Sequence, residues 1–126
     1  MIERLVSEVP EHIWQPPVVR RGRVWEDRFN VAAWVRFHES GGQLRLLVHY
    51  EDEGGEHRVP VDSVSAPGDG TALLSGVVKL RFTGKPLVVR IMLGLSDRGT
   101  SWSVDELYMQ RTSESITRQH KLIAGF

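Results

Sequence analysis

Residues 29–51 read FNVAAWVRFHESGGQLRLLVHYE, two runs of alternating apolar and polar side chains that a glycine pair separates. A two-residue turn at Gly41-Gly42 predicts a β-hairpin, because tight hairpin turns favour residues that adopt positive φ. One face of this hairpin is apolar, and a shift of one residue in the pairing would invert the two faces. The predicted pairs on the apolar face are Phe37 with Leu46, Val35 with Val48 and Ala33 with Tyr50.

A second hairpin is predicted with its turn at Gly54-Gly55. This turn places Tyr50 opposite Val59 and extends the same apolar face. The strand that follows the turn contains Pro60, which has no N–H to donate to a neighbouring strand. We therefore expect this strand at the edge of its sheet.

The alternation resumes in the second half of the chain and predicts two further hairpins, with turns at residues 84–85 and 97–100. The first of these turns would pair Leu80 with Val89. Seven candidate strands at short, regular spacing are typical of a β-sandwich or a barrel, and no long helical pattern lies between them. The sequence therefore predicts an all-β fold, a single antiparallel β-sandwich.

Length and composition fit one folded domain between two short arms. The chain has 126 residues, of which 40% are hydrophobic and 25% are charged, ordinary values for a globular protein. We expect the β-sandwich domain to occupy residues 18–112, with an N-terminal arm over residues 1–17 and a C-terminal tail over residues 113–126.

Both arms carry apolar residues at helical spacing. A short helix is predicted up to Pro10 and another over residues 114–124, where Gly125 is placed to end it. Ile13 and Trp14 are expected to pin the first arm to the domain. Either arm can instead pack on a second copy of the protein.

Charge and cysteine content exclude several classes of protein. Sixteen Lys and Arg residues balance sixteen Asp and Glu residues, whereas a general nucleic-acid binder carries a basic excess. The chain has no cysteine, which rules out a disulfide scaffold and a thiolate metal site. No apolar run approaches the roughly 20 residues that span a bilayer, and the first ten residues lack the apolar core of a signal peptide. We expect a cytoplasmic protein that binds neither nucleic acid nor membrane.

Potential metal ligands gather in the second predicted hairpin. These are His49, Glu51, Asp52 and His57. The alternation turns His49 and His57 to opposite faces, so that a single ion cannot easily bind both, and the ligand-rich loop of a calcium site is missing. We therefore predict no bound metal and no other cofactor.

The polar face of the first predicted hairpin carries the candidate ligand-binding residues, which are Trp34, Arg36, His38, Arg45 and His49. A guanidinium group suits carboxylates and phosphates, and an indole offers a flat surface for stacking. This face is therefore expected to bind a small anionic or polar ligand. The alternative is that these are ordinary solvent-facing side chains, with Trp34 covered by a terminal arm.

Glu106 breaks the alternation of the last predicted strand. Continued alternation from Val104 would bury its carboxylate and expose Leu107, and a buried carboxylate without a partner is very costly. A β-bulge at Asp105-Glu106 would return Leu107 to the interior. The alternative is an inward-facing acid with a raised pKa.

Residues 84–109 resemble the closing hairpin of jelly-roll carbohydrate-binding modules. A late strand of those modules commonly reads aromatic-x-Val-Asp-Asp-Val, with a bulge at the acidic pair, and residues 102–107 here read WSVDEL. The sequence departs from the pattern at the second acid and at the last apolar residue. The resemblance implies a jelly-roll sandwich and suggests a carbohydrate-like ligand.

Together these features favour a non-catalytic binding or interaction module. An enzyme is least favoured, because no nucleophile–base pair and no metal-ligand set can be assembled on one face. The alternative is a structural or regulatory subunit that binds a protein partner, or a second copy of itself, through a sheet edge or through its arms.

Overall fold

The computed structural model describes residues 2–15, 19–22, 24–37, 42–65, 70–96, 101–112 and 121–123, and these residues form nine strands and one short helix. The strands are β1 (Ile2–Glu8), β2 (Val19–Arg21), β3 (Val24–Phe37), β4 (Gln43–Asp52), β5 (Gly55–Ser65), β6 (Gly70–Thr83), β7 (Val88–Leu95), β8 (Trp102–Arg111) and β9 (Lys121–Ile123), and the helix is α1 (Glu11–Trp14). The predicted all-β fold is confirmed. No helix in this part of the chain is long and apolar enough to cross a membrane.

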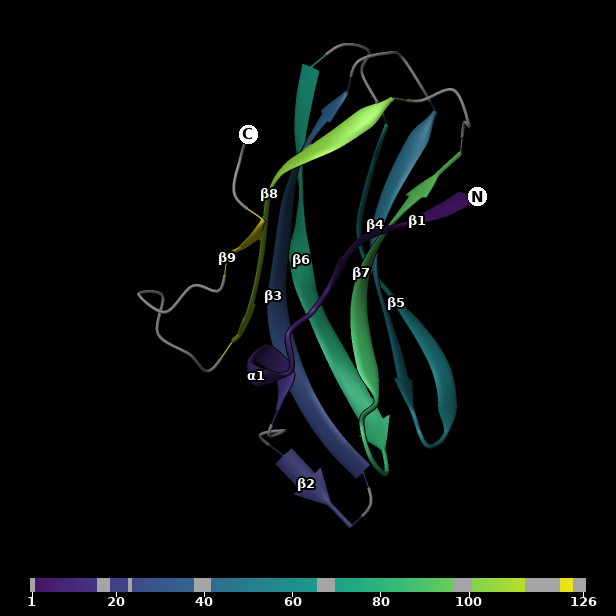
Figure 1. Cartoon of the computed structure of the whole chain (residues 1–126), viewed down its shortest axis with the longest axis vertical. Helices are drawn as coiled ribbons and strands as arrows, with labels where there is room; N and C mark the ends of the chain where they lie inside the picture. Colours follow the sequence, from purple (N-terminus) through teal and green to yellow (C-terminus); the bar gives the residue numbers. More distant parts are fainter. Residues whose placement is uncertain are drawn as a thin grey trace.

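The strands form two antiparallel sheets that pack face to face (Figure 1). In one, which we call the β4 sheet, the strand order is β1-β7-β4-β5. In the other, the β3 sheet, β3 pairs with β6 along one side and with β2 and β8 along the other, and β9 pairs with β8. The pairs β1–β7 and β4–β5 lie in the β4 sheet, and the pair β3–β6 lies in the β3 sheet. Successive pairs of one long antiparallel hairpin thus fall in alternate sheets. This is a jelly-roll sandwich.

Of the four predicted hairpins, one is present in the structure. Strands β4 and β5 pair across a turn at Glu53-Gly54, one residue earlier than predicted, so that Tyr50 lies opposite His57 instead of Val59. The predicted pairings of β3 with β4, β6 with β7 and β7 with β8 are wrong, because each of these connections crosses from one sheet to the other. Alternation defines which face of a strand is buried, and the inner faces of both sheets require the same pattern.

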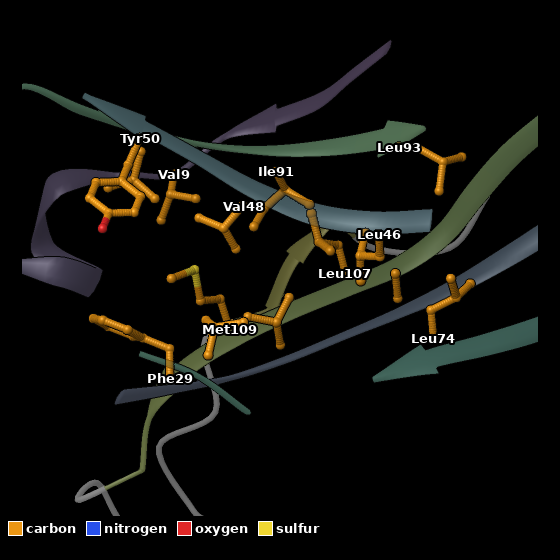
Figure 2. Close-up of a cluster of buried hydrophobic side chains, with 14 of the residues drawn as sticks. Val9, Phe29, Leu46, Val48, Tyr50, Leu74, Ile91, Leu93, Leu107 and Met109 are labelled. Atoms are coloured by element: carbon orange, nitrogen blue, oxygen red, sulfur yellow. The ribbon is translucent and has the colours of Figure 1, made fainter. Parts of the chain in front are cut away.

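The core lies between the sheets and is built from the side chains that the alternation assigns to the interior. Figure 2 shows Val48 and Ile91 of the β4 sheet facing Leu107 and Met109 of the β3 sheet, and all four side chains are fully buried. The predicted inner faces are therefore correct even where the predicted neighbours are not.

Residues 2–15 belong to the sandwich. Residues Ile2–Glu8 form β1, which pairs antiparallel with β7, so the predicted helix up to Pro10 is wrong. Pairing with a strand more than eighty residues away overrides the local helical spacing. The predicted anchoring role of Ile13 and Trp14 is confirmed. Both residues lie in α1, and their side chains are buried in the core.

The C-terminal tail contributes β9, which pairs with β8. The predicted helix over residues 114–124 is therefore wrong at residues 121–123, which are extended. The remainder of that prediction, with Gly125, lies outside the residues that the structure describes.

Strands β5 and β6 bring the two sheets together along one edge of the sandwich. Strand β5, which contains Pro60, is an edge strand of the β4 sheet as predicted. The N–H of Ser75 in β6 donates to Asp62 Oδ2 in β5 over 3.1 Å. A Cβ atom on Gly76 would lie 2.6 Å from the carbonyl oxygen of Val61, so the absence of a side chain at Gly76 allows this approach.

Gly76→Ala is expected to lower the free energy of unfolding by about 1–2 kcal/mol, because the added methyl group forces two backbones apart. Urea denaturation would measure the change. Thr71→Ala, at an exposed position of the same strand, serves as the control and is expected to change stability by no more than about 0.5 kcal/mol. Equal stability of Gly76→Ala and the wild type would contradict the close approach of β5 and β6.

Candidate functional site

The predicted ligand-binding residues are divided between the two outer faces of the sandwich. Trp34 and Arg36 lie in β3 and are exposed on the outer face of the β3 sheet. Arg45 and His49 lie in β4 and point to the outer face of the β4 sheet, on the opposite side of the molecule. His38 lies outside the described residues. The prediction that these side chains share one face is wrong, because it depended on pairing β3 with β4.

His49 is part of an ion-pair cluster on the β4 sheet. Its ligand atoms and those of Glu51 and Glu56 lie within 4.8 Å of one another, the only such trio in the part of the chain described. Nη1 of Arg90 lies 3.4 Å from Nδ1 of His49, and a guanidinium can only donate. This contact favours the proton on Nε2, which faces Glu56 at 3.8 Å. A cation at Nε2 would displace that proton and be repelled by Arg90, so the geometry opposes a metal centre here.

Asp52 and His57 form a polar junction between the β4–β5 hairpin and the β3 sheet. The fully buried carboxylate of Asp52 accepts hydrogen bonds from the N–H groups of Gly54 and Thr83, over 2.7 and 2.8 Å, and contacts Nε2 of His57 at 3.0 Å. The imidazole also stacks on the Tyr50 ring, with 4.8 Å between centroids. Burial alone would raise the pKa of Asp52, but these hydrogen bonds, led by the one from Thr83, outweigh it and hold the pKa below its ordinary value.

A β-bulge in β8 positions two carboxylates beside Trp34. Glu106 lies opposite Trp34, and the pairing resumes with Val104, so that Asp105 is the extra residue. The predicted bulge is confirmed, and Leu107 returns to the core, where it is fully buried. The alternative of an inward-facing acid is wrong, because Glu106 lies on the outer face of the sheet.

Both carboxylates of the bulge make hydrogen bonds on that outer face. Asp105 Oδ2 accepts from Arg36, over 3.2 Å from Nε and 2.9 Å from Nη2. Glu106 Oε2 accepts from the hydroxyl of Tyr108 over 2.7 Å. Polar groups with defined orientation therefore adjoin the indole of Trp34.

The exposed apolar side chains of the molecule concentrate on this same face. Trp34 is 40% exposed, and its cross-strand neighbour Leu73 in β6 is 44% exposed. Val77, which is 60% exposed, lies four residues further along β6. Three of the five exposed large hydrophobic residues in the described part of the chain thus belong to one sheet face, a distribution that marks a candidate binding surface. We call this surface the Trp34 face: Trp34, Arg36, Leu73, Val77, Asp105, Glu106 and Tyr108.

Sequence reasoning found Trp34 and Arg36 but missed the contribution of β6. The feature of the sequence that indicates this contribution is the pair of doubled apolar residues in β6, Leu73-Leu74 and Val77-Val78. In an alternating strand, a doubled apolar residue places one side chain inside and the other outside. Leu74 and Val78 are buried, and Leu73 and Val77 are exposed.

Comparison with known proteins finds no match, whether with protein-family models, curated proteins or solved structures. The resemblance of residues 84–109 to carbohydrate-binding modules thus stays a prediction. The chemistry of the Trp34 face is the available guide to function.

Proposed function

We propose that the protein is a non-catalytic binding module that holds a carbohydrate-like ligand on the Trp34 face. The observation that carries the proposal is the exposed indole of Trp34 between an apolar neighbour, Leu73, and the outward carboxylate of Glu106. An indole stacks on the apolar face of a sugar ring. The nearby carboxylates and the Arg36 guanidinium form charge-assisted hydrogen bonds with hydroxyl groups.

The local charge favours a neutral group directly over Trp34. Arg36, two residues along β3 from Trp34, is already paired with Asp105. An anion placed here would have to compete with that carboxylate for the guanidinium. Arg45 and His49, two of the residues expected to hold an anion, lie on the other sheet.

Trp34→Ala is expected to weaken ligand binding at least tenfold, because a central aromatic side chain carries a large share of the binding energy at such surfaces. Native gel electrophoresis through soluble β-glucan, xylan or galactomannan would detect binding as retarded migration. Arg45→Ala, on the opposite outer face, is the matched control and should migrate like the wild type.

Retardation that persists in Trp34→Ala would contradict the proposed site. Absence of retardation in every polymer, combined with a dimer that Trp34→Ala dissociates in size-exclusion chromatography, would instead support the alternative function of a protein-interaction subunit.

A further inference from the structure

The outer face of the β3 sheet becomes cationic beyond the Trp34 face. Lys79 of β6 lies directly opposite Arg28 of β3. The hairpin predicted with its turn at residues 84–85 would instead pair Lys79 with Arg90, which lies in the other sheet. Arg81 follows two residues along β6, opposite Glu26. Like charges directly opposite each other destabilise a sheet, so the Arg28–Lys79 pair is unfavourable unless an anion lies against it.

Two of the three cations, Lys79 and Arg81, share a single carboxylate. Nζ of Lys79 lies 3.3 Å from Glu26 Oε2, and Nε of Arg81 lies 3.9 Å from Glu26 Oε1. The exposed guanidinium of Arg28 has no ion pair among the described residues, since the neighbouring Asp27 is buried and paired with Arg111. This patch therefore carries a net charge of about +2 and is open to solvent.

The cationic patch and the Trp34 face lie on the same strands. Arg28 and Trp34 are six residues apart in β3, and their neighbours Lys79 and Leu73 are six apart in β6, which corresponds to about 20 Å at roughly 3.3 Å per residue. Val77 lies on the same face between the two ends. An extended ligand that runs along β3 and β6 would therefore touch both.

We infer that the cationic patch, Arg28, Lys79 and Arg81, is an anion-binding subsite and that the ligand is an acidic polysaccharide. This inference rests on the proposed function and adds the class of ligand to it. A neutral sugar ring lies on Trp34, and a carboxylate or sulfate further along the chain lies between Arg28 and Lys79.

A sparsely charged polysaccharide fits this surface better than a nucleic acid does. A nucleic acid carries a phosphate at every nucleotide, and a phosphate near Trp34 would find the Arg36 guanidinium already paired with Asp105. The chain as a whole has a formal net charge of zero, whereas nucleic-acid-binding proteins carry a basic excess.

The test compares two polymers with one backbone: a polygalacturonate in which most carboxylates are methyl esters and the remaining few are charged, and its full methyl ester, in which none is charged. Dissociation constants measured by calorimetry are expected to favour polygalacturonate, and added NaCl should remove the preference because it screens exposed charges. Arg28→Gln and Lys79→Gln should each weaken binding of polygalacturonate about two- to fivefold and leave binding of the full methyl ester unchanged. Arg45→Gln, on the opposite face, is the matched control.

Equal binding of the two polymers, failure to bind polygalacturonate, or an Arg28→Gln, Lys79→Gln double variant with wild-type affinity would each overturn the inference. These results leave the proposed function intact if neutral polymers still retard the wild type and not Trp34→Ala. Tighter binding of single-stranded DNA than of polygalacturonate, weakened by the same two substitutions, would overturn it in favour of a nucleic-acid ligand.

Discussion

Trp14→Ala is expected to lower the free energy of unfolding by about 3–5 kcal/mol, the range for removing a large aromatic side chain from a core. Trp14 is 1% exposed, and its ring stacks on Phe82 of the β3 sheet with 6.0 Å between centroids. Its Nε1 donates to the carbonyl oxygen of Val9 over 3.2 Å. The substitution leaves both a cavity and a buried carbonyl without this partner. Chemical denaturation followed by circular dichroism would measure the loss.

Trp34→Ala makes the same chemical change at a site that is 40% exposed and serves as the matched control. It is expected to cost about 1 kcal/mol or less, as is usual for substitutions near the surface. If Trp14→Ala lowers the free energy of unfolding by no more than Trp34→Ala does, the structure is contradicted, because the segment that carries Trp14 would then be a dispensable arm. A large loss in Trp14→Ala alone establishes the N-terminal segment as part of the sandwich.

The sequence was sufficient to predict the buried face of most long strands, because burial leaves a mark on every second residue. Val35 and Val48 are correctly predicted to be buried, although their predicted pairing with each other is wrong. A strand's neighbour depends on which connections cross between the sheets, and Gly-rich turns serve both kinds of connection. The helix predicted up to Pro10 is wrong for the same reason, because the partner strand β7 is far away in sequence.

The candidate site was predictable where the signal was local. The bulge followed from the cost of burying Glu106, a property of one strand alone. The predicted grouping of Arg45 with Trp34 depended on pairing β3 with β4. Because these strands lie in different sheets, the two side chains lie on opposite faces of the sandwich. By the same error, the predicted pairing gives Lys79 the like-charged neighbour Arg90, whereas its neighbour in the structure is Arg28. Only the three-dimensional arrangement brings the cations of β3 and β6 onto the face that carries Trp34.

Asp52→Asn is expected to lower the free energy of unfolding at pH 7 by about 2–4 kcal/mol, because buried N–H donors lose a charged acceptor. The carboxylate joins the tip of the β4–β5 hairpin to Thr83 at the end of β6, so the loss falls on a contact between the two sheets. Asp62→Asn is the matched control: it also accepts an N–H from β6, that of Ser75, but it is partly exposed. Its expected cost is about 1 kcal/mol or less.

The same carboxylate gives the protein a defined sensitivity to acid. The pKa of Asp52 is lowered from its ordinary value of 3.8, so in acid the unfolded chain takes up the proton before the folded chain does. The stabilisation by Asp52 is therefore complete well above that ordinary value and is lost as the pH falls through the lower pKa of the folded state. Urea denaturation between pH 6 and pH 3 should show the wild type and Asp62→Asn losing stability more steeply than Asp52→Asn below about pH 4. Equal slopes for the wild type and Asp52→Asn would mean that the charge on Asp52 does not hold the hairpin against β6.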